Sequence, residues 1–494
     1  MVVKWLVSLF LVFVVVFILI LPKEYDIQAS IDQKHREGGG AVELPPRTIY
    51  LEDTIVLRSG VHLKGAENGQ TILKIKAKIH GEPNRAKLLE AEEGAVDVKV
   101  SNITFDGDKQ NRESLIDDPS AHTISFPFVK NFEIYNTTII NSAGASIVLY
   151  NAEDGLVENN TIIDSGSNGI LGLQAMKNIV VKGNTVKQVD YQNGIYFSYQ
   201  EGKSSENIII EGNTVENAGD FGIEVGHNVK EGDTPHRQIV IARNTVLHSQ
   251  NAGIAFRTVS QGRIEHNTIE GYGKTGGYGG DGIFVEGGFN KAYDVSVTDN
   301  FVKQTYESGN ANGIYITGID GALIERNTVL NSNGKGIFVQ ASNLGEATAD
   351  FKDGLREYER ITIRKNEIFE SKNEGIHLQG AGSENNEIVD NHVKRNRSTG
   401  IFVANIYRSS GLEIEDNTVT DNEANGIEVY NQDDLRLDEN TVESGGKAAI
   451  KVVSTRYGQI TNNTLRIADV DGAYEPIIIE SSEDIETQNN IESY

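Results

Sequence analysis

The sequence contains no cysteine, which excludes disulfide bonds, thiolate zinc sites and a cysteine nucleophile. Proline is scarce, with 8 residues against 51 glycines in a chain of 494. This balance favours many short strands joined by tight turns, because proline lacks the backbone N–H that strands use. Positive charge is also in deficit. The chain has 45 Lys and Arg against 71 Asp and Glu, and its net charge of -26 argues against nucleic acid as a partner.

Two interleaved repeats run through most of the chain. Ten copies of Gly-Ile follow one another between Gly169 and Ile427, at steps of 23 to 39 residues. A second series consists of Asn followed by Thr. Its members are Asn136, Asn160, Asn184, Asn213, Asn244, Asn267, Asn327, Asn417, Asn440 and Asn463, with looser copies at Asn300, Asn366 and Asn391. A period near 25 residues is the signature of a solenoid, which grows in one dimension and needs no second core.

Each repeat divides into three short strands. In residues 179–201, a first strand at 179–181 and a second at 185–186 flank the turn Gly183-Asn184, and a third follows at 194–198. We therefore predict an all-β, single-stranded parallel β-helix of about 14 coils, whose repeat body spans residues 101–494. Asn tolerates left-handed backbone geometry and can bond to the same turn of the next coil. The Asn series is accordingly expected to be a buried structural ladder, and the Gly of Gly-Ile a turn residue before an inward-facing Ile.

The N-terminal region has a different composition. Residues 1–25 contain Lys4 and then an uncharged run of 17 residues, Trp5 to Leu21. This length is at the lower limit for a membrane-spanning helix. An uncleaved anchor is favoured over a cleaved signal peptide, because no small-residue cleavage site follows the run. Both interpretations predict an extracytoplasmic protein, membrane-anchored or secreted. Residues 26–100 are expected to hold a capping helix at 26–37 and the first coils.

The opening of the body resembles a known family. The segments Ser30-Ile31-Asp32, Gly38 to Pro45 and Ile55 to Gly65, followed by Asn102 to Gly107, are similar to the first coils of right-handed β-helix proteins of the pectate-lyase superfamily. The resemblance extends over nearly the whole chain after residue 26. It implies a right-handed coil and an activity on polysaccharides, and it is much less specific for the reaction.

Candidate functional positions follow the Gly-Ile copies, because side chains alternate inward and outward along a strand. Glu224, Arg257, Glu286, His227 and His377 are the candidate catalytic residues. Candidate substrate-binding residues mix aromatic rings with amides, as apolar sugar faces and polar sugar edges require. They are Tyr196, Phe284, Tyr315, Phe338, Gln340, Gln379 and Phe402. The competing interpretation is that these aromatic rings stack on one another and are purely structural. Long connections at 199–206, 227–237, 270–281, 286–294 and 341–360 are expected to wall the same face.

Three functions remain open at this face. The first is elimination or C5 epimerisation of a uronic-acid polysaccharide, in which Arg257 neutralises the carboxylate while His227, His377 or Tyr196 moves protons. Glu224 and Glu286 would then hold a divalent cation, with Ca²⁺ as the candidate. The second is glycoside hydrolysis by the same two carboxylates. The third is a non-catalytic carbohydrate-binding or surface scaffold. The oligomeric state is open.

The signature motifs of two branches of the superfamily are missing from this sequence. The hydrolase branch of the superfamily carries Asn-Thr-Asp, Asp-Asp and Gly-His-Gly motifs, whereas no Asn-Thr copy here is followed by Asp and Gly226-His227 is followed by Asn228. The similar mannuronan C5-epimerase modules carry Asp-Pro-His. Residues 146–151 stand in that place without the motif, and only 233–236, Asp-Thr-Pro-His, partly matches it. The resemblance thus favours lyase or epimerase activity over hydrolysis and leaves the catalytic set unassigned.

Overall fold

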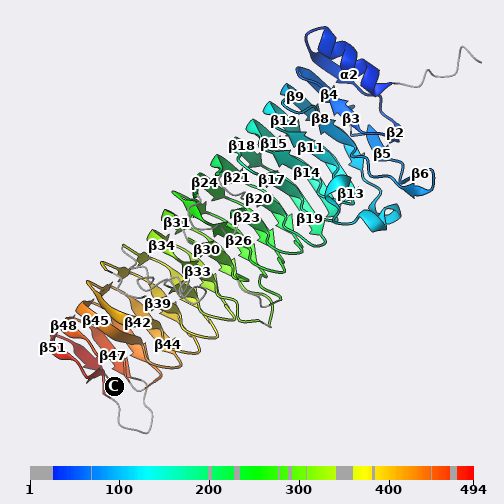
Figure 1. The fold of residues 1–494 in the computed structure, drawn as a ribbon. Coiled ribbons are helices and arrows are strands. Elements are labelled where there is room, and N and C mark those ends of the chain that lie inside the picture. Colours follow the sequence, from blue (N-terminus) through cyan, green and yellow to red (C-terminus); the bar gives the residue numbers. More distant parts are fainter. Residues whose placement is uncertain are drawn as a thin grey trace, which may run out of the picture.

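Short apolar strands, three to a coil, stack into a long rod in the computed structural model (Figure 1). The structure describes residues 26–67, 69–198, 203–226, 234–275, 279–287, 292–307, 309–340, 360–380, 384–446, 448–467 and 475–493. The right-handed parallel β-helix predicted from the repeats is confirmed. One face is a 17-stranded sheet with one strand per coil, against the 14 or so coils expected. The first coils lack the Gly-Ile signature, so the repeat count missed them.

The face that begins at the Gly-Ile copies is termed the Gly-Ile face. Its strands are β3 (Ile55–Leu57), β8 (Leu89–Ala91), β11 (Ile124–Pro127), β14 (Ile147–Tyr150), β17 (Ile170–Leu173), β20 (Ile195–Phe197), β23 (Ile223–Gly226), β26 (Ile254–Arg257), β30 (Ile283–Glu286), β33 (Ile314–Thr317), β36 (Ile337–Gln340), β39 (Ile376–Gln379), β42 (Ile401–Ser410), β45 (Ile427–Asp438), β47 (Ile450–Val453) and β50 (Ile477–Glu480). They pair in parallel from coil to coil, each Ile beside the Ile of the next copy.

The second face follows the Gly-Ile face along the chain. Its strands are β1 (Gly40–Glu43), β4 (Val61–Lys64), β9 (Val96–Ser101), β12 (Lys130–Tyr135), β15 (Glu153–Glu158), β18 (Lys177–Lys182), β21 (Glu206–Glu211), β24 (His236–Ala242), β27 (Val259–Ser260), β28 (Arg263–Glu265), β31 (Ala292–Thr298), β34 (Ile319–Glu325), β37 (Thr362–Arg364), β40 (Glu387–Val389), β43 (Glu413–Glu415), β48 (Arg456–Thr461) and β51 (Glu483–Gln488). Strand β45 bends from the first face into the second, and the two faces together count as one 33-stranded sheet.

The third face is the 17-stranded sheet. Its strands are β2 (Thr48–Leu51), β5 (Ile72–Ile75), β10 (Thr104–Asp106), β13 (Thr138–Ser142), β16 (Thr161–Ser165), β19 (Thr185–Val189), β22 (Thr214–Glu216), β25 (Thr245–Leu247), β29 (Thr268–Glu270), β32 (Phe301–Lys303), β35 (Thr328–Leu330), β38 (Glu367–Phe369), β41 (His392–Lys394), β44 (Thr418–Asn422), β46 (Thr441–Ser444), β49 (Thr464–Ile467) and β52 (Ile491–Ser493). A short antiparallel hairpin, β6 (Lys78–Ile79) with β7 (Glu82–Pro83), and three 3₁₀ turns, η1 (Lys109–Asn111), η2 (Glu113–Leu115) and η3 (Pro119–Ala121), decorate the first coils.

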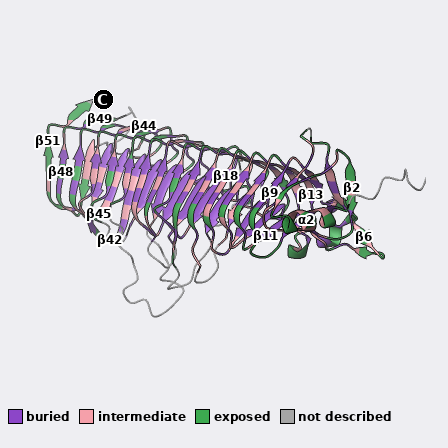
Figure 2. Cartoon of the chain, turned by 90° about the horizontal axis from the view of Figure 1, so that it is seen from above, coloured by how far each residue is buried: buried purple, intermediate pink, exposed green. Residues whose placement is uncertain are grey.

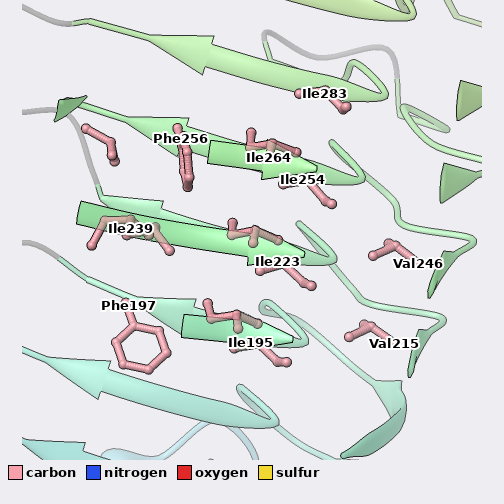
Figure 3. Close-up of a cluster of buried hydrophobic side chains, with 14 of the residues drawn as sticks. Ile195, Phe197, Val215, Ile223, Ile239, Val246, Ile254, Phe256, Ile264 and Ile283 are labelled. Carbon is pink, nitrogen blue, oxygen red and sulfur yellow. The ribbon is translucent and has the colours of Figure 1, made fainter. Parts of the chain in front are cut away.

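Inward side chains of all three faces form one continuous core. Buried residues, in purple, accordingly recur along the length of the rod in Figure 2. Each coil contributes Ile, Val or Phe at alternating positions, and these side chains stack on their counterparts in the next coil, as Ile195, Ile223, Ile254 and Ile283 do (Figure 3). Burying one such side chain stabilises the fold by about 1.5–3 kcal/mol. The core is therefore a column of similar layers, and stability accumulates along the rod.

The Gly of Gly-Ile stands at a bend immediately before its strand, as predicted, and close packing also requires it. A Cβ built on Gly253 would lie 2.3 Å from Ile269 Cγ2 and 2.7 Å from the carbonyl oxygen of Gly282. No positive φ is involved at this position. Glycine is needed because the backbone of one coil lies against its neighbour and against the side chain of the third face.

The Asn ladder is confirmed as a buried structural element. Each amide accepts from the preceding coil and donates to the next: Asn244 Nδ2 donates to Asn267 Oδ1 (3.0 Å), and Asn267 Nδ2 donates to Asn300 Oδ1 (3.0 Å). Asn136 was assigned to the ladder wrongly. It is exposed with φ of 51°, and Thr137 occupies the ladder position, donating its backbone N–H to Asn160 Oδ1 (3.0 Å). The residue with left-handed backbone geometry stands immediately before the ladder position. At 136–138 that residue is Asn136 itself, so the Asn-Thr dipeptide matches the repeat one residue too early.

The predicted capping helix is present as α2 (Ile27–Arg36). Asp26 caps it by accepting a hydrogen bond from the N–H of Ala29 (2.9 Å), and Ile31 is fully buried in the end of the core. The helix covers strand edges that would otherwise be open to pairing. Within the described residues, none of the helices is long and apolar enough to cross a membrane. The anchor or signal segment predicted at 1–25 lies outside the described residues.

Candidate functional site

The register of the Gly-Ile face places outward side chains from neighbouring coils in columns. Tyr196 of β20 stands beside Glu224 of β23. Gly226, two residues after Glu224 on β23, belongs to the next column, where it stands beside Arg257 of β26, which in turn stands beside Glu286 of β30. Because Gly226 has no side chain, the guanidinium of Arg257 can lean back toward the coil of Glu224. We refer to Tyr196, Glu224, Arg257 and Glu286 as the central cluster.

Arg257 lies between the two carboxylates. Its Nε donates to Glu286 Oε2 at 3.0 Å and its Nη1 donates to Glu224 Oε1 at 3.4 Å. The opposite oxygen of Glu224, Oε2, accepts a hydrogen bond from Asn193 Nδ2 at 2.6 Å. The side chain of Glu224 is 4% exposed, and those of Arg257 and Glu286 are each 12% exposed. Charge-assisted bonds of this kind hold all three groups in one geometry.

Burial decides the protonation state of Glu224. It raises the pKa of this carboxyl from 4.5 to about 7, although Arg257 and the hydrogen bond from Asn193 act in the opposite direction. Desolvation disfavours the charged form, so Glu224 changes protonation near neutral pH. Burial, reinforced by the negative charge of Glu224, also raises the pKa of Tyr196 to about 12. Its phenol therefore stays protonated and can act as a hydrogen-bond donor.

Two further buried acids, Asp220 near Arg257 and Asp281 near Tyr315, were not predicted from the sequence. Burial raises the pKa of Asp220, and it raises the pKa of Asp281 to about 7. Asp281 accepts hydrogen bonds from the backbone and side-chain nitrogens of Asn312, at 2.7 and 2.8 Å. Asn193 and Asp281 both occupy the position immediately before Gly-Ile. A polar residue at this position of the repeat could have identified both side chains from the sequence.

The aromatic residues of the Gly-Ile face form a stripe of stacked rings. Phe284 and Tyr315 lie 5.6 Å apart, Tyr315 and Phe338 lie 4.9 Å apart at 10°, and Phe338 and His377 lie 4.9 Å apart. Phe284 is 1% exposed and Tyr315 and Phe338 are each 8% exposed, in a cluster separate from the main core. These three rings pack on one another and are largely covered, as the structural interpretation expects, and their role in binding a substrate stays a prediction. Tyr196 and Phe402 are only half-buried.

The amides of the next column are linked to the stripe. Tyr315 donates its hydroxyl proton to Gln340 Oε1 at 2.6 Å, and Gln340 Nε2 donates to Gln379 Oε1 at 3.3 Å. Both glutamines are half-buried. Their predicted role in binding a ligand along the face stays a prediction.

The structure separates His377 from the central cluster. It lies four coils from Arg257, or roughly 19 Å at the spacing of parallel strands. Burial lowers the pKa of His377, which is a neutral member of the aromatic stripe. His227 lies outside the described residues, as do most of the long connections expected to wall this face. Catalytic roles for both histidines stay predictions.

Arg257 occupies the space between the two proposed metal ligands. Within the described ranges, no three His, Asp or Glu side chains are grouped as a metal site requires. A Ca²⁺ ion at Glu224 and Glu286 would have to compete with the guanidinium for the same oxygens. The Ca²⁺ site stays a prediction.

A family model described as "Right handed beta helix region" matches residues 59–231, 234–405 and 281–491. A curated relative, Alginate lyase 7 of Azotobacter vinelandii, is 31% identical over 124 residues, which are 23% of this chain. The chain spans 14% of the length of that relative.

Several solved structures are similar to the chain at low identity. The periplasmic alginate epimerase AlgG is 15% identical, with 76% of this chain and 82% of that chain covered and a TM-score of 0.49. A GH87 α-1,3-glucanase of Streptomyces thermodiastaticus is 13% identical, with 80% and 66% covered and a TM-score of 0.49. The A-module of the mannuronan C-5 epimerase AlgE6 of Azotobacter vinelandii is 13% identical, with 95% and 94% covered and a TM-score of 0.32.

Proposed function

Since the chain belongs to the right-handed β-helix family, we propose that it is a polysaccharide-active enzyme whose reaction takes place at the central cluster. The favoured reaction is elimination or C5 epimerisation of a uronic-acid polysaccharide. The observation that carries the proposal is the fixed cation of Arg257 between two carboxylates, one of which changes protonation near pH 7. The relative named as an alginate lyase supports the choice of substrate class.

The roles follow from the environments of the groups. When Glu224 is protonated, it no longer neutralises Arg257. The Nη1 of Arg257 can then pair with the carboxylate of a uronate while its Nε stays bonded to Glu286. The positive charge of Arg257 stabilises the carbanion character that develops when the C5 proton is removed. Glu286, held as a hydrogen-bond acceptor by Arg257, is the base that takes the C5 proton. Glu224 or the phenol of Tyr196 donates a proton to the leaving oxygen in elimination, or to the opposite face of C5 in epimerisation.

Glycoside hydrolysis is the second candidate, because two carboxylates in different environments are also its requirement. Glu224 would again be the acid, and Glu286 the base or nucleophile. The two reactions differ in what they demand of Arg257. Elimination needs a cation on the substrate carboxylate, whereas hydrolysis of a neutral sugar does not.

We also propose that the body acts outside the cytoplasm, tethered through residues 1–25. The basis is the uncharged run that follows Lys4. Fractionation of cells expressing the full chain and a variant lacking residues 1–25 tests this. The full chain is expected in the membrane fraction and the shortened one in the soluble fraction. Equal distribution of the two would contradict the tether.

A substrate panel tests the reaction. Alginate, pectate, glycosaminoglycans and a neutral α-glucan are incubated with the protein, and three signals are followed: absorbance of unsaturated uronate, new reducing ends, and the proton spectrum of the polymer. Elimination raises the absorbance, hydrolysis raises reducing ends alone, and epimerisation changes only the spectrum. Glu224→Gln and Glu286→Gln should abolish the signal. Glu216→Gln, a surface carboxylate on the third face, is the control and should retain it.

If the protein changes no polymer of the panel, or if both cluster variants keep full activity, the proposal fails. Chelation by EDTA is run in parallel, since loss of activity restored by Ca²⁺ would support the cation at Glu224 and Glu286. A protein that retards a polymer in affinity electrophoresis without altering it would be a binding scaffold.

A further inference from the structure

The far end of the Gly-Ile face holds a second group of ring and polar side chains. Phe402 of β42, Tyr430 of β45 and Lys451 of β47 come from three successive coils. All three are half-buried, in contrast to the covered rings of the stripe between Phe284 and Phe338. The rings of Phe402 and Tyr430 lie 5.7 Å apart and are nearly perpendicular, at 68°.

The polar atoms of this group are held in place by the residues around them. Tyr430 donates its hydroxyl proton to Glu428 Oε2 at 3.1 Å. The other oxygen of Glu428 accepts from Asn425 Nδ2 and from Thr399 Oγ1, the latter at 3.4 Å. Lys451 stands beside Glu428 in the register and pairs with Glu480 across 3.4 Å. The group therefore offers a carboxylate, a phenol and an ammonium beside a ring face.

The neighbours of Phe402 leave part of its ring accessible. In the second outward column, Ala404 follows Gln379 and precedes Tyr430. Ala404 carries only a methyl group beside Phe402. Toward the central cluster the ring of Phe402 meets that of His377 at 4.8 Å, so a ring-sized ligand over Phe402 would have His377 and Gln379 on that side and Tyr430 on the other.

We propose that Phe402, Tyr430, Glu428 and Lys451 form a distal subsite for one pyranose unit of the polysaccharide acted on at the central cluster. The inference rests on the proposed function for the identity of that polymer. The apolar face of the sugar lies on Phe402, and its hydroxyl edge meets Glu428, Tyr430 and Lys451. This pattern of a ring with a few fixed polar groups is what a sugar requires. Carboxylates flank Lys451, so recognition is through ring face and hydroxyls.

The distance to the reaction centre sets a length requirement. Strands β26 and β45 are six coils apart, which corresponds to roughly 29 Å. Gln340 and Gln379 lie on the path between them. A polymer or a long oligosaccharide can reach both sites at once, whereas a trisaccharide bound at the central cluster cannot. Long substrates gain affinity from the second contact without any change in the chemical step.

The test compares KM and kcat for the polymer and for a trisaccharide of the same sugar. Phe402→Ala should raise KM for the polymer roughly 5-fold, as loss of one aromatic contact implies, with kcat unchanged. It should leave both constants for the trisaccharide unaltered. Tyr430→Phe and Lys451→Met, which keep the packing, should give smaller increases of the same kind. Tyr457→Ala removes a tyrosine, 58% exposed, from β48 on the second face and is the matched control.

Affinity electrophoresis separates failure of the subsite from failure of the proposed function. If Glu224→Gln abolishes the reaction and the distal variants bind the polymer as tightly as the parent, the subsite is wrong and the proposed function stands. If the Phe402→Ala variant retards the polymer less than the parent protein does, but the parent catalyses no reaction, the subsite stands and the enzyme proposal fails. Equal loss for polymer and trisaccharide, or no polymer bound at all, overturns the subsite.

Discussion

Glu224→Gln should make stability less dependent on pH, because the buried carboxyl of Glu224 resists ionisation. Its pKa is raised in the folded protein to about 7 from an ordinary value of 4.5. The unfolded chain therefore ionises first as pH rises. The contribution of Glu224 to stability is fully present below pH 4.5 and is lost as pH rises through 7. A neutral Gln at this position has no such loss.

The expected magnitude follows from the pKa difference. A shift of one pKa unit corresponds to 1.36 kcal/mol, so a rise from 4.5 to about 7 amounts to about 3 kcal/mol of lost stability above pH 7. The free energy of unfolding is measured in urea at pH 4 and pH 8 for both proteins. The variant-minus-parent difference should be about 3 kcal/mol more favourable at pH 8 than at pH 4. Comparing the two pH values cancels the packing change, and it also cancels the contribution of Asp281, present in both proteins.

Glu216→Gln is the control for the change in net charge. Glu216 pairs with Lys187 on the surface at 2.9 Å, so its variant-minus-parent difference should vary by less than about 0.5 kcal/mol between the two pH values. A difference for Glu224→Gln that is equally small, or that favours the parent at pH 8, would refute the assignment of Glu224 as the buried acid of the site.

Three further outcomes are expected. Asn267→Ala should lower the free energy of unfolding by about 3–5 kcal/mol, because it leaves buried donors and an acceptor of adjacent coils without partners. The control Asn136→Ala, at an exposed position, should lower it by under about 0.5 kcal/mol when both are unfolded in urea. Gly253→Ala should destabilise by at least about 2 kcal/mol or prevent soluble expression, since its Cβ would overlap the next coil; normal melting would contradict this. Arg257→Met should move the pKa of Glu224 upward, since Arg257 lowers it, so the loss of stability with rising pH should continue to a higher pH than in the parent; an unchanged pH dependence of the unfolding free energy in a folded variant would contradict the pairing.

The sequence predicted the fold well because the solenoid repeats its requirements. Between Gly169 and Ile427 each coil repeats an Ile in the core, an Asn at the ladder and a glycine where two backbones meet, so the same signal recurs many times. The exceptions are local. Asn136 shows that a dipeptide can match the repeat one residue out of place.

The site was predicted only in part. Alternation along strands correctly placed Glu224, Arg257 and Glu286 on one face, and the structure joins them through the guanidinium. Alternation does not tell whether an outward side chain is covered, and Phe284 proved to be buried against its neighbours. The contact between Asn193 and Glu224 joins residues 31 apart in the sequence, one just before its Gly-Ile copy and the other just after the next copy.

The sequence by itself determined the parallel coil and the direction of side chains along its strands, because these depend on short patterns that the repeat restates; the right hand followed from the family resemblance, and the capping helix from residues 26–37. Only the tertiary structure decided which outward groups pair, stack or stay accessible. That outcome depends on side chains from three or more coils meeting at once, as Arg257 does between two carboxylates and Phe402 does beside Tyr430. Burial then determines their chemistry, since the pKa of Glu224 is raised by desolvation, which no stretch of sequence displays.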